Sequence, residues 1–217
     1  MTLDTRFHQV IRMIPPLLLS LTLLTGCVSQ VALTKSARES IRSVSINKDI
    51  KLPDDMYYQG LGQSVGVATG LIGMAVAQEA AQGHKAYLKA AMRENQIDFP
   101  QIVREQFETA LAGAHIFPWI ALEGGDAEVR LEILSYGFIQ ASGFSSHLKP
   151  LLQVTGRLVR TDGTVLWQQY NYVGNMSGQT PAHTLEEYLR NPQFIREAIT
   201  VAAQIVSDGL VKHIQQD

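Results

Sequence analysis

A predicted β-hairpin over residues 151–173 constrains the fold of this chain more than any other feature. Alternating apolar and polar residues flank Asp162-Gly163 on both sides. Asp-Gly favours the positive φ angles of tight hairpin turns, and strands joined by such a turn pair antiparallel. A two-residue loop would place Leu158 opposite Trp167 and Val159 opposite Leu166. The hairpin therefore argues against a doubly wound parallel sheet and requires other elements to cover one of its faces.

The rest of the chain alternates between helical and strand patterns. Period-two stretches predict strands at 41–46 and 129–133, and a capping box, Thr184 with Glu187, opens a short helix. Further helices are predicted from about 60 to 94, from Asp98 to about Gly113, and from Asn191-Pro192 to near the end. This order predicts an α+β fold, a two-layer domain in which helices pack on a mainly antiparallel sheet.

The first 26 residues carry an export signal. Arg6 and Arg12 outweigh Asp4 before an apolar run over residues 17–24. That run is far shorter than the roughly 20 residues that a membrane-spanning helix needs, so it is typical of a cleaved signal peptide.

Leu24-Thr25-Gly26-Cys27 follows the apolar run and resembles the lipobox of bacterial lipoprotein precursors. Cys27 is the only cysteine of the chain, so a disulfide within the chain is excluded. The resemblance implies cleavage between Gly26 and Cys27, a diacylglycerol on the Cys27 thiol and an acylated new amino terminus. Val28, where an aspartate would signal inner-membrane retention, implies the outer membrane, facing the periplasm. The alternative is a free thiol beyond an ordinary signal peptide.

These observations divide the chain into three parts. Residues 1–26 are the lipoprotein signal peptide, 27–40 a lipidated tether of small and polar residues, and 41–217 a single periplasmic α+β domain. The order of elements in that domain is loosely similar to that of small periplasmic lipoproteins such as the curli-secretion lipoprotein. No residue motif accompanies this likeness, so it implies no function.

The segment over about 60–78 is rich in glycine and has no charged residue before Glu79. On a helix, Gly62, Gly66, Gly70 and Gly73 form a ridge of small residues that lets another element approach closely. We expect this ridge to serve either an oligomer interface or close packing inside the domain. Membrane insertion is a third, less favoured interpretation, because polar residues and glycines dilute its hydrophobicity.

One motif points to an enzyme. Gly62-Gln63-Ser64-Val65-Gly66 matches the G-x-S-x-G turn that presents the nucleophile of α/β-hydrolases. Asp126 or Asp162 with His183 or His213 would complete a triad in chain order. The motif lies too near the start of the mature chain for the many-stranded parallel sheet that it requires, so a lipid-anchored serine hydrolase using Ser64 is the alternative hypothesis.

Composition excludes further classes of function. A net charge of −2 gives no basic excess for nucleic acid, and six widely spaced histidines indicate no metal site. No cofactor and no catalytic set is predicted. The expected function is a non-enzymatic binding, assembly or transport accessory protein. Its expected partners are the membrane, through the N-terminal lipid, and either another envelope protein or a second copy of the chain.

Overall fold

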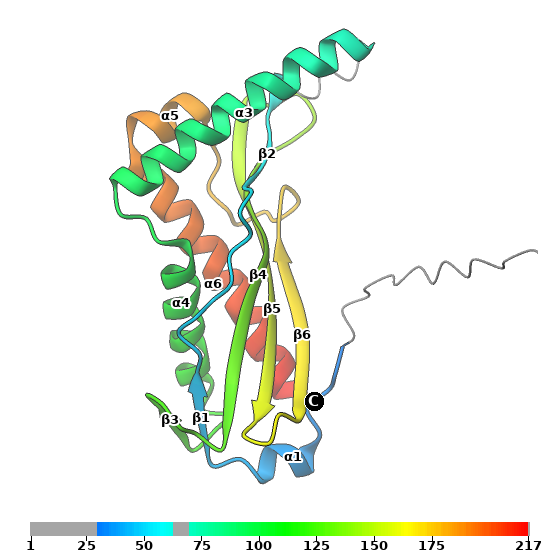
Figure 1. The fold of residues 1–217 in the computed structure, drawn as a ribbon, viewed down its shortest axis with the longest axis vertical. Helices are drawn as coiled ribbons and strands as arrows, with labels where there is room; N and C mark the ends of the chain where they lie inside the picture. The colour runs from blue at the N-terminus through cyan, green and yellow to red at the C-terminus, as the bar shows by residue number, and fades with distance from the viewer. Residues whose placement is uncertain (1–29, 63–69, 217) are drawn as a thin grey trace, which may run out of the picture.

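The computed structural model describes residues 30–62 and 70–216, and these form an α+β fold as predicted (Figure 1). The strands are β1 (Ser43–Ile46), β2 (Tyr57–Gln59), β3 (Trp119–Ala121), β4 (Ala127–Gln140), β5 (His147–Arg160), β6 (Val165–Val173) and β7 (His183–Thr184). The helices are α1 (Lys35–Glu39), α3 (Gly70–Glu94), α4 (Phe99–Ala114), α5 (Leu185–Arg190) and α6 (Pro192–Gln216).

The sheet is mixed, which corrects the expectation of a mainly antiparallel one. Strand order is β3-β1-β4-β5-β6, with β2 beside β4 and β7 beside β5. β4, β5 and β6 form an antiparallel meander, whereas β1 and β2 run parallel to β4, and β3 runs parallel to β1. The parallel pairs arise because segments far apart in sequence meet at one edge, and α3 and α4 supply the crossover that such pairs require.

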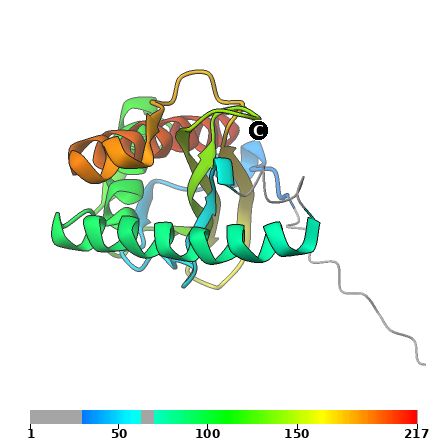
Figure 2. The same ribbon diagram turned by 90° about the horizontal axis from the view of Figure 1, so that it is seen from above.

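Helices cover the two faces of the sheet unequally. α6 lies behind β4 and β5 in Figure 1 and packs against α4, β5 and β6. Figure 2 shows the strands between α6 and α3, so α3 crosses the opposite face, at one end of the sheet only. We call this opposite face, away from α4 and α6, the outer face. Its lower part carries no helix in Figure 1.

The predicted hairpin is confirmed, with a different turn. Gly163 adopts φ +88°, and its N–H donates to the carbonyl of Arg160 at 2.9 Å. The turn is longer than two residues, so Val159 pairs with Val165. The expected pairing of Val159 with Leu166 is therefore wrong, whereas the expected pairing of Leu158 with Trp167 is confirmed. The longer turn is offset by a bulge between Leu158 and Val159, so the strands beyond it keep the expected register.

A second irregularity divides β4. Its register with β5 shifts between Ile133 and Ser135, which leaves Leu134 as an extra residue. Every second residue of 127–133 is buried before the shift, and every second residue of 136–140 after it. The shift therefore exchanges odd for even positions on the helix-covered face.

The predicted caps set the helix starts. The Asp98 side chain accepts from the N–H of Gln101 at 3.1 Å at the start of α4, and Thr184 and Glu187 form the predicted capping box of α5. One continuous core joins α4, α6 and the sheet. Its largest fully buried side chains are Trp167, Tyr188, Phe99, Phe107 and Phe138.

Part of the segment expected to be a tether is attached to the domain. Val31 pairs with Gln168 of β6 through hydrogen bonds of 2.8 and 2.9 Å, and Leu33 is fully buried. Thr34 then caps the short helix α1. From Val31 onward the chain is therefore packed on the sheet and does not act as a free spacer.

Candidate functional site

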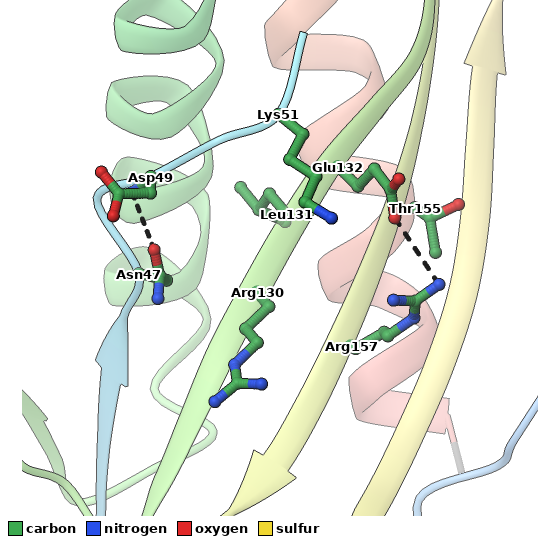
Figure 3. Close-up of a pocket in the computed structure, with 8 residues that line it drawn as sticks. All are labelled: Asn47, Asp49, Lys51, Arg130, Leu131, Glu132, Thr155 and Arg157. Atoms are coloured by element: carbon green, nitrogen blue, oxygen red, sulfur yellow. Dashed lines mark hydrogen bonds and ion pairs between the residues drawn. The ribbon is translucent and has the colours of Figure 1, made fainter.

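A polar hollow of about 280 Å³ lies on the lower part of the outer face. We call it the outer-face hollow (Figure 3). β4 and β5 form its floor, and the segment that leaves β1 forms one wall. It is lined by Asn47, Asp49, Lys51, Arg130, Leu131, Glu132, Thr155 and Arg157.

The wall is held by hydrogen bonds that bend the chain after β1. The Asn47 amide donates to Glu128 Oε1 at 3.0 Å, and its Oδ1 accepts from the Asp49 N–H at 2.7 Å. This second bond is an Asx-type turn, which favours a change of chain direction. The Lys51 carbonyl then accepts from the Ile133 N–H at 3.0 Å. Lys51 is thereby fixed at the edge of β4, beside Glu132.

The floor carries charges that are mostly paired. Arg130 Nε donates to Glu128 Oε2 at 2.6 Å. Arg157 Nη2 lies 3.6 Å from Glu132 Oε2, and its Nε donates to Gln168 Oε1 at 2.8 Å. Each glutamate of the floor therefore has an arginine partner, and these pairs nearly cancel in charge.

Lys51 is the cation that the hollow leaves without a partner. Its Nζ makes no hydrogen bond or ion pair with any residue in the described part of the chain. Figure 3 shows this amine directed over β4, toward the middle of the hollow, whereas the Asp49 carboxylate points away from it. The hollow therefore presents one uncompensated positive charge.

Thr155 lines the same hollow, and its hydroxyl is buried. The residue is 1% exposed, and its Oγ1 has no hydrogen-bond partner among the described residues. Glu132 and Tyr170 are its neighbours across the sheet, on β4 and β6, and Figure 3 shows the hydroxyl directed toward β6. A buried hydroxyl without a partner costs free energy, so this position is a weak point in the stability of the sheet.

A second hollow of about 280 Å³ lies between α4 and the β1–β3 edge. It is more apolar, with Ile46, Ile120 and Leu122 among its lining residues. Its Lys48 is already paired with Glu123 at 2.6 Å. No unpartnered buried side chain faces it among the described residues, so the outer-face hollow is the stronger candidate.

The structure places only some of the site residues predicted from sequence. Gly26, Cys27, Ser64 and Gly66 lie outside the described residues. Gly70 and Gly73 belong to the first turns of α3, in agreement with a helical segment there. A Cβ built on Gly62 meets no atom within 4 Å. Close packing among the described residues therefore does not account for that glycine.

The two aspartates proposed for a triad lie far from His183. Asp162 lies in the turn after β5, and Asp126 precedes Ala127, which pairs with Arg160 at the same end. His183 pairs with Leu148 at the opposite end of this 14-residue strand. Fourteen extended residues span about 45 Å, so neither aspartate reaches His183.

His183 instead packs, partly exposed, against aromatic side chains near α5. Its ring stacks on Phe194 at 4.1 Å, and Nδ1 lies 4.0 Å from Glu187 Oε2. In the described ranges no three His, Cys, Asp or Glu side chains come together as a metal site would require. None of the helices in those ranges has the length and hydropathy to cross a membrane.

Sequence reasoning did not identify the outer-face hollow. The alternation of Glu128, Arg130 and Glu132 marks one wet face of a strand. Nothing in the sequence indicates that Lys51 lies beside Glu132, because the two pair in parallel across 80 intervening residues. The sequence signals for this site are the polar strand face of Glu128, Arg130 and Glu132 and the turn-favouring Asn47, and neither indicates that the two segments meet.

Comparisons with known proteins give fold similarity only. No family model matches the chain, and no curated protein matches it either. Similar solved structures include a protein from Xanthomonas campestris of the DUF330 family, with 15% identity, a TM-score of 0.40 and coverage of 54% of this chain. The chain spans 64% of the length of that protein.

Two further structures are similar at a comparable level. One is a PelC variant dodecamer from Paraburkholderia phytofirmans, with 10% identity, a TM-score of 0.40 and coverage of 86% of this chain and 95% of that one. The other is a candidate lipoprotein from Caulobacter crescentus CB15, with 14% identity, a TM-score of 0.34 and coverage of 55% and 86%. At these scores the likeness is one of loose architecture, and no family is assigned to the chain.

Proposed function

We propose that this chain is a lipid-anchored outer-membrane protein that faces the periplasm and acts by binding, as a non-enzymatic accessory factor. The observation that carries the proposal is the lipobox-like Leu24-Thr25-Gly26-Cys27 at the end of a signal-peptide pattern. Two or more acyl chains supply a stable anchor, at about 0.8 kcal/mol for each buried CH₂ group.

The packed start of the domain supports an anchor that holds the fold close to the membrane. Cys27 precedes Val31 by four residues, and Val31 is already paired with Gln168 of β6. Four extended residues reach at most about 14 Å. The edge of β6 would therefore stay within about 14 Å of the lipid surface, with the outer-face hollow on the adjoining strands.

The chemistry of the outer-face hollow supports a binding role. Charged and polar side chains line it, among them Lys51, Arg130 and Arg157. Ammonium and guanidinium groups make strong hydrogen bonds to negatively charged oxygen atoms, so the hollow has the groups to hold a polar ligand.

Labelling tests the anchor directly. We expect the wild-type chain, expressed with its signal peptide, to incorporate a fatty-acid analogue and to fractionate with the outer membrane. Cys27→Ala should lose the label. Equal labelling of the Cys27→Ala chain would overturn the proposal.

We also propose self-association through the glycine ridge. The supporting observation is that a Cβ on Gly62 would meet no atom of the described residues within 4 Å, so packing among these residues does not require a glycine there. Replacing Gly62 and Gly70 with Leu should lower the sedimentation coefficient while leaving the circular dichroism spectrum unchanged. Gly83→Leu, on α3, where a Cβ would likewise meet no described atom within 4 Å, is the matched control. An assembly that survives the ridge substitutions would exclude this interface.

A further inference from the structure

The outer-face hollow combines an unpaired cation with several free N–H donors. Lys51 Nζ has no partner among the described residues, and Arg130 uses only Nε for its hydrogen bond to Glu128. Arg157 likewise donates through Nε, and its terminal Nη2 makes only the 3.6 Å ion pair with Glu132. Terminal guanidinium and ammonium groups that are free to donate suit a ligand with several negatively charged oxygen atoms.

The glutamates of the floor do not exclude such a ligand. Glu128 and Glu132 are each compensated by an arginine, and Asp49 points out of the hollow (Figure 3). The remaining charge is that of Lys51.

The hollow also lies close to the point where the chain would leave the membrane. Arg157 is bonded to Gln168, and the backbone of Gln168 is bonded to Val31. Arg157 on β5 and Val31 are separated by two strand spacings, or about 10 Å. Val31 itself follows the proposed lipidated Cys27 by four residues. Membrane headgroups would therefore be at high local concentration beside the hollow.

We propose that the outer-face hollow binds the phosphate group of a lipid headgroup in the membrane that holds the acyl anchor. The Lys51 amine and the terminal nitrogens of Arg157, which lie on the same side of the hollow in Figure 3, donate to the phosphate oxygens. This inference rests on the proposed anchoring at Cys27. It assigns the outer face of the sheet to the lipid surface.

The phosphate site is tested first without a membrane. The lipidated chain in a nonionic detergent is titrated with inorganic phosphate at low ionic strength, and amide chemical shifts are followed by NMR. Lys51→Gln should weaken phosphate binding at least about tenfold, the effect of removing one charge-assisted hydrogen bond. Lys35→Gln removes the same charge from α1, where the side chain is 86% exposed, and should have no effect. Absence of saturable binding, or equal losses in both variants, would overturn the proposal.

The source of the phosphate is tested in vesicles. Headgroups that occupy the hollow should weaken the binding of inorganic phosphate about tenfold when the protein is inserted in phosphatidylglycerol vesicles, compared with detergent. Inorganic phosphate that binds equally well in both settings would overturn the headgroup assignment. The Cys27→Ala domain separates the two proposals, because it should keep phosphate binding in solution whether or not the anchor exists.

Discussion

Replacing Thr155 with Val tests the interpretation of the outer-face hollow at its most buried group. The substitution exchanges a hydroxyl for a methyl group of nearly equal volume at a site that is 1% exposed. Because Thr155 Oγ1 has no partner among the described residues, valine removes a desolvation cost without removing a hydrogen bond. That cost is about 1–3 kcal/mol for a buried hydroxyl.

We therefore expect Thr155→Val to raise the free energy of unfolding by about 1 kcal/mol, the lower end of that range. For a chain of this size the corresponding rise in Tm is about 2–4 °C. Urea unfolding followed by circular dichroism measures the first quantity and calorimetry the second.

Thr155→Ser is the matched control. It keeps the hydroxyl and removes one methyl group, so it should lower the free energy of unfolding by about 1 kcal/mol. If Thr155→Val is instead destabilising by 1 kcal/mol or more, the hydroxyl has a stabilising partner and the reasoning fails.

Three further predictions concern the framework of the fold. Gly137 has φ +143°, and a Cβ there would lie 1.9 Å from the Tyr57 carbonyl oxygen. Gly137→Ala should therefore separate β2 from β4 and lower the free energy of unfolding in urea by about 2–4 kcal/mol. Gly83→Ala is the control and should be neutral or stabilising, because a Cβ at this position on α3 meets no described atom within 4 Å. The backbone N–H groups of Arg42 and Ser43 donate to Asp126 and hold the pKa of its carboxyl below the usual value. The ionised carboxylate therefore stabilises the fold above pH 4, and this stabilisation is lost as the pH falls through the lowered pKa. In Asp126→Asn the free energy of unfolding should depend less on pH below 4, and an unchanged dependence would contradict this role of Asp126. Burial raises the pKa of Tyr58 to about 12, so the free energy of unfolding should fall as the pH rises above 10. Ionisation of this phenol should appear as a rise in absorbance at 295 nm near pH 12, and that rise should be missing in Tyr58→Phe.

Local signals in the sequence predicted the local structure well. The capping residues Asp98 and Thr184 begin helices where they were expected to, because a cap acts on backbone groups within three residues. The hairpin is also local, and only its turn differs. Asp162-Gly163 is compatible with more than one turn length, and the choice between them depends on the whole strand pair.

Contacts between segments that are distant along the chain could not be predicted from the sequence. The parallel pairs of β1 and β2 with β4 join residues separated by about 80 positions, and no local pattern specifies them. The outer-face hollow depends on one of these meetings, that of Lys51 with Glu132. Its floor could be predicted as a wet strand face, but its wall and therefore its concave shape could not.

The extra residue Leu134 in β4 has a consequence for how much change this strand tolerates. Below it, Arg130 and Glu132 face the hollow, and above it the strand turns Phe138 into the core. Deleting Leu134 would keep the composition of β4 almost intact and yet invert one half of the strand relative to the other. Either charged side chains would enter the core or aromatic ones would face water. A single-residue deletion here should be far more damaging than most substitutions, which makes the length of β4, and not only its residues, part of the information that specifies the fold.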